Sequence, residues 1–120
     1  MAKGIVLYTD GTHEDKVFKQ LSQYQTAVDG LIESVRMHDY YGAEVCNAYV
    51  NEEGILLNLP INPVASALSF MFGNRGQMVG NMIIVGNSDD DGNDTDIPDD
   101  IFAFIKRVSG NREMLAAEYV

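Results

Sequence analysis

The chain has 120 residues, which is the size of a single domain. Apolar residues make up 46% and charged residues 22%, a balance that excludes both a disordered tail and a membrane protein. The 18 acidic residues outnumber the 8 basic ones and give a net charge of −10. Because binding to DNA or RNA is driven by neutralising phosphates, this charge disfavours direct contact with nucleic acid. The single cysteine excludes an internal disulfide and fits a reducing compartment.

The first thirty residues predict a strand followed by a helix. Residues 4–8 form a β-branched and aromatic run that a turn-forming Asp-Gly pair closes. Thr12 and Asp15 have the spacing of a capping box, and apolar residues then recur at intervals of four, three and four. We therefore expect a helix over about residues 14–29 that ends at Gly30. The apolar stripe of this helix consists of Val17, Leu21, Tyr24 and Val28.

Strands are predicted in the middle of the chain. Residues 31–37 have the composition of a strand with imperfect alternation, and residues 44–50 alternate cleanly. The sequence Asn51-Glu52-Glu53-Gly54 is typical of a hairpin connection, because its glycine can adopt the positive φ that a type I turn with a bulge demands. We expect residues 55–59 to return antiparallel to residues 44–50.

The second half predicts two helices around one strand. Asn62 is a natural N-cap and Pro63 a natural first residue of a short helix that is apolar on most sides and stops at Gly73. A strand centred on residues 82–85 follows. The last helix is expected from about Pro98 to Ser109, with a further turn over Asn111 to Tyr119.

These elements predict an α+β fold, a small and mostly antiparallel sheet of about five short strands with three helices packed on one face. The sequence leaves a half-open barrel as the alternative. With neither an internal repeat nor a linker, residues 1–120 are expected to form a single domain with an acidic loop at about residues 87–97. Six methionines and the largely apolar helix over residues 64–72 also favour a homo-oligomer.

The acidic loop is the main candidate for a functional site. Seven aspartates and no basic residue lie between Asn87 and Asp100, so this segment carries −7 of the net −10. An acidic surface of this kind is suited to binding a protein partner. The predicted partner-binding residues are Asp89, Asp90, Asp91, Asp94 and Asp96.

The same segment partly imitates a calcium loop. The order Asn87-x-Asp89-x-Asp91-Gly92 matches the first half of an EF-hand loop, including the glycine at its sixth position. The twelfth position should be a glutamate and is Pro98, and the preceding element has a strand pattern where the motif needs a helix. We therefore predict no metal site, with a weak loop-type calcium site as the alternative.

The sequence contains no catalytic constellation. Cys46 lies in an alternating strand that suits a small buried side chain, and His13 and His38 lie in turn or loop segments. Glu52 and Glu53 are adjacent at a solvated turn, where nothing would separate their pKa values. No nucleophile elbow, phosphate-binding glycine loop or zinc-ligand spacing is present. We expect no enzymatic activity, no catalytic residue and no cofactor.

Several motifs resemble one known family. They are Gly30-Leu31-Ile32-Glu33-Ser34-Val35, Val50-Asn51-Glu52-Glu53-Gly54, Leu59-Pro60-Ile61-Asn62 and Val79-Gly80-Asn81-Met82-Ile83-Ile84-Val85-Gly86. Over roughly residues 17–108 the chain resembles a domain-of-unknown-function family that is frequent in bacteriophages, prophages and some bacterial genomes. The resemblance implies a phage-type accessory protein of the host bacterial cytoplasm, with no assigned activity and no site residue to carry over.

The residues and the resemblance together leave three functional hypotheses. The first is a non-enzymatic phage or prophage accessory protein that binds another protein. The second is an acidic mimic of nucleic acid that inhibits a host DNA-binding or defence enzyme. The third is a small ligand-binding or hydrolytic domain that uses the predicted hairpin with Tyr40 and Tyr41, which requires a deep pocket lined by Glu52, His38 and Tyr40.

Overall fold

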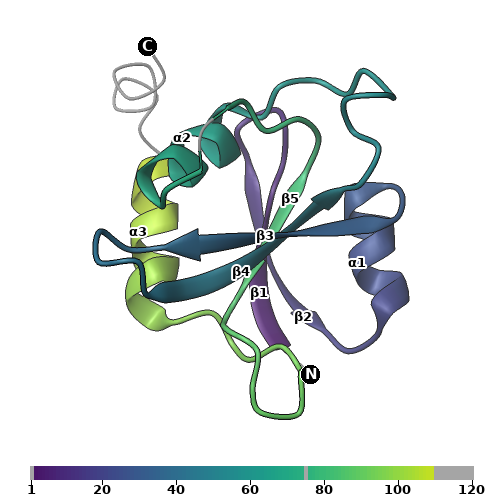
Figure 1. The fold of residues 1–120 in the computed structure, drawn as a ribbon. Helices are drawn as coiled ribbons and strands as arrows, with labels where there is room; N and C mark the ends of the chain where they lie inside the picture. The colour runs from purple at the N-terminus through teal and green to yellow at the C-terminus, as the bar shows by residue number, and fades with distance from the viewer. Residues whose placement is uncertain (1, 75, 110–120) are drawn as a thin grey trace.

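The computed structural model describes residues 2–74 and 76–109, which build one antiparallel sheet and three helices (Figure 1). The elements in chain order are β1 (Ala2–Leu7), β2 (His13–Phe18), α1 (Leu21–Val28), β3 (Ile32–His38), β4 (Glu44–Asn51), α2 (Pro63–Met71), β5 (Met82–Val85) and α3 (Asp99–Ser109). The five strands lie in the order β2-β1-β5-β4-β3 and form an open sheet rather than a half-open barrel. The predicted α+β class is confirmed.

The helices cover both faces of the sheet, so the expectation that all three pack on one face is wrong. Figure 1 shows α1 on one side of the strands and α2 with α3 on the other. The central strands β1 and β5 explain this arrangement, because their side chains are apolar on both faces. Ile5 and Ile84 belong to the core under α2 and α3, whereas Val6 and Ile83 belong to the core under α1. Both faces therefore have to be covered.

The helix predicted over residues 14–29 is wrong in its first half. Residues 13–18 form β2, which pairs with β1 in a regular antiparallel register from Leu7 opposite His13 to Ala2 opposite Phe18. The chain reverses through a turn in which the Tyr8 amide donates to the Thr12 carbonyl at 2.9 Å. Thr12 and Asp15 consequently form no capping box, and α1 begins only after Gln20, whose amide donates to the Gln23 side chain.

The strand predicted over residues 55–59 is also wrong. Both edges of β4 are already occupied, by β3 on one side and β5 on the other, so no place in the sheet is left for it. Residues 52–58 instead form consecutive turns, in which the Leu57 amide donates to the Glu53 carbonyl at 2.8 Å. Asn58 takes the left-handed conformation with φ 55°, and Gly54 does not have the positive φ that the predicted hairpin turn demands.

The other predicted elements are confirmed. β3 pairs with β4 in a regular register from Ile32 to Met37, followed by a register shift between Met37 and His38. Asn62 caps α2 by accepting from the Ala65 amide, with Pro63 as the first helical residue. Helix α3 places Ile105 in the core. The predicted turn over Asn111 to Tyr119 lies outside the described residues.

Candidate functional site

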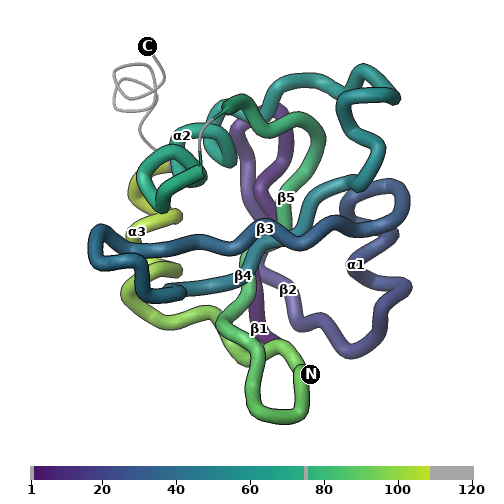
Figure 2. Tube along the Cα trace, in the orientation of Figure 1, coloured from purple at the N-terminus to yellow at the C-terminus, as the bar shows by residue number. Residues whose placement is uncertain are grey.

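The acidic segment forms a β-hairpin that extends beyond the sheet beside the N-terminal end of β1 (Figure 2). We call residues 86–96 the acidic hairpin. Its two arms are joined by a bridge between Ser88 and Asp94 and by a bond from the Gly86 amide to the Thr95 carbonyl at 2.8 Å. The turn is closed by Asp89, whose side chain accepts from the Asp91 amide at 3.0 Å and the Asn93 amide at 2.9 Å. The predicted loop is therefore an ordered structure.

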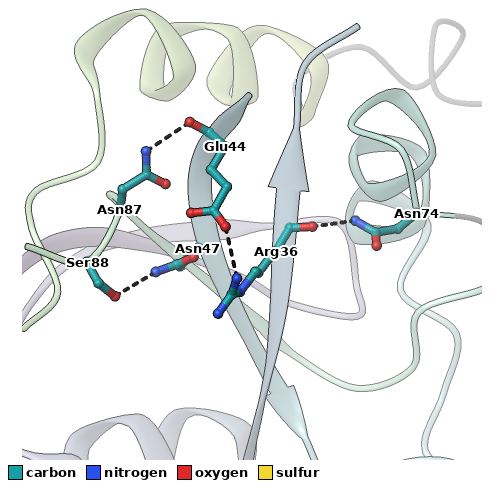
Figure 3. A network of polar contacts seen from close by, with 6 residues as sticks. All are labelled: Arg36, Glu44, Asn47, Asn74, Asn87 and Ser88. Carbon is teal, nitrogen blue, oxygen red and sulfur yellow. Dashed lines mark hydrogen bonds and ion pairs between the residues drawn. The ribbon is translucent and has the colours of Figure 1, made fainter. Parts of the chain in front are cut away.

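Polar side chains attach one arm of the acidic hairpin to β4 (Figure 3). The Asn87 side chain donates to the Glu44 carbonyl at 2.9 Å, and Asn47 donates to the Ser88 hydroxyl at 3.1 Å. On the neighbouring strand, Arg36 pairs with the Glu44 carboxylate at 3.1 Å. These contacts hold the hairpin in one position relative to the sheet.

The five aspartates predicted to bind a partner have different environments. Asp89 closes the turn, Asp96 accepts from the Lys3 amide at 2.7 Å, and Asp94 accepts from two tyrosines. Asp90 and Asp91 lie exposed at the tip, and no other described side chain pairs with their carboxylates. Three of the five thus have a structural contact, and two are displayed to solvent.

Asp94 stands at the edge of a pocket on the α1 face of the sheet. Its carboxylate accepts from the Tyr49 hydroxyl of β4 at 2.8 Å and from the Tyr24 hydroxyl of α1 at 2.9 Å. The Tyr24 ring stacks on Phe18 at 4.6 Å and meets the Tyr49 ring edge-on at 5.3 Å. These residues and Ile32 line a hollow of about 290 Å³, which we call the tyrosine–aspartate pocket.

The environment keeps both hydroxyls of this pocket protonated. Burial, the hydrogen bond to Asp94 and the negative charge of Asp94 all raise the pKa of Tyr24 and of Tyr49 above the ordinary value. Both side chains therefore act as neutral donors toward Asp94, and the cluster carries the single negative charge of its carboxylate.

A second hollow lies on the opposite face, beside the turns that replace the predicted strand. It has a volume of about 240 Å³, and apolar groups from Val35, Val50, Met78 and Val79 line it together with Ile55 and Leu56. We call it the apolar groove. Glu33 and Glu52 also line it, and no basic residue is among its described lining residues.

The side chains beside the groove are unusually exposed for their size. Ile55 is 82%, Leu56 86% and Leu57 54% exposed, and together we call them the apolar shoulder. Scattered exposed apolar residues are ordinary, but adjacent large ones next to a hollow mark interaction surfaces. No sequence pattern predicts this surface, because residues 55–59 have the composition of a strand.

The residues of the hydrolytic hypothesis are not brought together. His38 pairs with Glu44 at one end of β3 and β4, whereas Glu52 follows Asn51, which pairs with Ile32 at the other end. Tyr40 is 95% exposed in the turn between these strands and lines neither described hollow. The pocket that this hypothesis requires is therefore not formed.

The remaining candidate groups are separated as well. Cys46 is buried, and burial raises the pKa of its thiol to about 12, so the reactive thiolate is suppressed. Within residues 2–74 and 76–109, no cluster of His, Cys, Asp and Glu has the geometry to hold a metal ion. No helix in the same described ranges is long and apolar enough to cross a membrane.

The fold and its two hollows define a small α+β domain with an acidic hairpin and an apolar groove. The model of the family described as "Domain of unknown function (DUF3846)" matches residues 2–109, nearly the whole chain. The chain therefore belongs to this family, which confirms its resemblance to a domain of unknown function. No curated protein and no solved structure matches the chain.

Proposed function

We propose that this domain is a non-enzymatic protein-binding module and that the apolar groove with its shoulder is the principal contact surface. The exposure of Ile55, Leu56 and Leu57 carries the proposal. Covering such side chains on association removes apolar surface from water at roughly 25 cal/mol per Å². Ile55 and Leu56 are the most exposed large aliphatic side chains of the described residues, whereas Leu68 is fully buried.

The chemistry of the groove indicates the kind of partner. Its floor is apolar, and its carboxylates at Glu33 and Glu52 have no basic neighbour among the described lining residues. An amphipathic segment of another protein, with apolar side chains flanked by lysine or arginine, is complementary to this surface. The net charge of −10 would steer such a basic partner toward the domain.

The acidic hairpin contributes to the same recognition in this proposal. Asp90 and Asp91 at its tip are the carboxylates best placed for contact, while Asp89, Asp94 and Asp96 act through the shape of the hairpin. These internal bonds also make a nucleic-acid mimic the weaker proposal. A mimic needs carboxylates displayed over an extended face, and three of these five are engaged within the domain.

We also propose that the domain is a phage or prophage accessory protein that acts in the bacterial cytoplasm. The resemblance of its motifs to a family frequent in phages supports this, and the identity of the neighbouring genes tests it. Genes for capsid, lysis or defence functions beside this one would agree with the proposal. A place among conserved metabolic genes would contradict it.

Capture of a partner from a lysate of the producing cell tests the binding surface. We compare the unchanged domain with Leu56→Asp in the shoulder and with Tyr40→Asp as a matched control, since both side chains are exposed at opposite ends of the β3–β4 pair. The partner should be retained by Tyr40→Asp and reduced at least about tenfold by Leu56→Asp. Equal recovery by both variants would contradict the proposal.

Measurement of the oligomeric state of the same variants tests the other occupant of the groove. A second copy of the chain would make the unchanged domain a dimer that Leu56→Asp dissociates. The proposal expects the same molecular mass for both proteins by light scattering. If the unchanged domain is a dimer and Leu56→Asp is a monomer, the groove binds a second copy of the chain and not another protein.

A further inference from the structure

The tyrosine–aspartate pocket combines one carboxylate with three aromatic rings. The carboxylate belongs to Asp94 on the acidic hairpin, and the rings belong to Phe18 of β2, Tyr24 of α1 and Tyr49 of β4. Four segments distant in sequence thus converge on one hollow of about 290 Å³. Aromatic faces beside a carboxylate attract cations that have an apolar body.

Within the described part of the molecule, no basic side chain forms an ion pair with the carboxylate of this pocket. Asp94 accepts only from the two neutral hydroxyls, and neither ion pair of the described residues involves it. Cation–π contacts occur elsewhere, where Lys3 and Lys106 lie over the Phe102 ring and Arg107 lies over the Phe104 ring. None of these described contacts reaches the three rings of the pocket.

Lys19 is the one basic residue among the described lining of the pocket. It is exposed, and its backbone amide is bonded to the Gln23 side chain. An ammonium group at the rim repels an incoming cation and attracts an anion. The effect of removing the Lys19 ammonium group on affinity therefore reports whether the ligand is positively or negatively charged.

We propose that the tyrosine–aspartate pocket binds an organic cation, an alkylammonium or guanidinium group whose charge meets Asp94 and whose apolar part lies against Tyr49 and Ile32. A carboxylate has about four lone-pair positions, so Asp94 can accept from a cation while it keeps both tyrosine hydrogen bonds. The hollow is large enough for a basic side chain or a small free amine.

The test is a titration monitored by amide chemical shifts in NMR spectra. The probes are N-acetyl-lysine methylamide, N-acetyl-arginine methylamide and n-butylammonium, with N-acetyl-norleucine methylamide as the neutral control. The cationic probes should cause saturable shifts at residues 92–94, and the neutral probe should not. Tighter binding of the amino-acid probes than of n-butylammonium would indicate a basic side chain of a partner, and the reverse would indicate a free amine.

Variants connect the binding to the named groups. Asp94→Asn keeps the size and the acceptor oxygen but removes the charge, and it should weaken binding about tenfold. Asp91→Asn on the same hairpin is the matched control and should leave the affinity unchanged. Lys19→Gln should tighten binding of the cationic probes. Weaker binding after Lys19→Gln, or equal binding of the norleucine probe, would overturn the proposal.

Two further variants distinguish loss of the cation site from distortion of the hairpin and from failure of the proposed contact surface. Tyr49→Phe removes one hydrogen bond to Asp94 but retains the aromatic ring and the charge of Asp94. This variant should still bind the cationic probes. Loss of binding in Asp94→Asn alone would then be due to the missing charge and not to a distorted hairpin. Leu56→Asp lies on the opposite face and should leave the titration unchanged. Loss of partner capture with intact cation binding would therefore count against the groove alone. Absence of saturable shifts with all cationic probes would refute the pocket.

Discussion

The side-chain amide of Asn62 donates a hydrogen bond of 3.0 Å to the backbone carbonyl of Leu7. The same nitrogen donates to the Gly80 carbonyl at 3.0 Å, and the Asn62 oxygen accepts from the Ala65 amide at 3.1 Å. Asn62 is completely buried. One side chain thus caps α2 and ties it to the end of β1 and to the segment before β5.

Replacing Asn62 by alanine should strongly destabilise the domain. The change removes the helix cap and leaves the Leu7 and Gly80 carbonyls without this donor, which together predict a loss of about 2–4 kcal/mol in the free energy of unfolding. Asn62→Ser retains a capping oxygen but lacks the amide group that donates to the two carbonyls, so it should lower the free energy of unfolding by less. Urea denaturation measures both, and a loss within about 0.5 kcal/mol for Asn62→Ala would contradict this role.

Leu68 and Leu56 form a matched pair for core and surface. Leu68 of α2 is fully buried, whereas Leu56 is 86% exposed in the shoulder. Leu68→Ala should lower the free energy of unfolding by about 2–5 kcal/mol, and Leu56→Ala should change it by no more than about 0.5 kcal/mol. A large destabilisation by Leu56→Ala would mean that the shoulder packs within the domain and is not a contact surface.

Apolar periodicity alone does not distinguish β2 from α1 in the first thirty residues. Val17, Leu21, Tyr24 and Val28 have helical spacing, yet Val17 lies in β2 and only the other three lie in α1. The Asp10-Gly11 pair is a hairpin signal, and Gly11 takes the positive φ of 89° that such a turn uses. This local signal is compatible with the β1–β2 hairpin, whereas the capping-box spacing of Thr12 and Asp15 favours a helix.

The predicted hairpin after β4 failed for a tertiary reason. Asn51 does start a turn, because its side-chain oxygen accepts from the Glu53 amide at 2.8 Å. The neighbour of β4 is nevertheless β5, which follows some thirty residues later along the chain, with Ala48 opposite Ile84. Local composition cannot reveal that a distant strand takes this position. Because β5 takes it, residues 55–57 lie outside the sheet and form the exposed shoulder.

The sequence predicts an acidic loop at about residues 87–97, but it predicts neither the hairpin structure nor its contacts. A run of aspartates is visible in the composition, whereas the pairing of Asp94 with Tyr24 and Tyr49 joins residues 70 and 45 positions apart. Nothing in the spacing of these residues signals that they meet. Contacts of this range depend on the strand order, which the sequence analysis did not predict.

The tyrosines whose hydroxyls donate to carboxylates predict that the domain loses stability in alkali. A hydrogen bond to Glu14, with burial, raises the pKa of Tyr8 to about 12, and burial with Asp94 raises the pKa of Tyr24 and Tyr49 further. In the unfolded chain these groups ionise near pH 10. The stabilisation they provide is fully present below about pH 10 and is lost as the pH rises toward the folded-state values.

Urea midpoints measured from about pH 9 to pH 11 check this dependence. The midpoint should fall across this range, because the unfolded chain releases protons that the folded chain retains. Tyr49→Phe removes one titrating group and should give a shallower fall. A midpoint that rises with pH in this window would contradict the assigned environments.

Cys46 should be chemically inert in the folded domain. The side chain is 1% exposed, and burial raises the pKa of its thiol to about 12. A disulfide reagent at about pH 8 should therefore modify it only after denaturation. Rapid stoichiometric labelling of the native protein would contradict its position in the core.

Hydrogen–deuterium exchange of the domain, alone and with its captured partner, tests the proposed contact surface most directly. The account predicts slower exchange on binding at residues 52–57 and 77–79, which border the apolar groove, and unchanged exchange at the turn that contains Tyr40 and Tyr41. Protection confined to that turn, with no change at the groove, would contradict it.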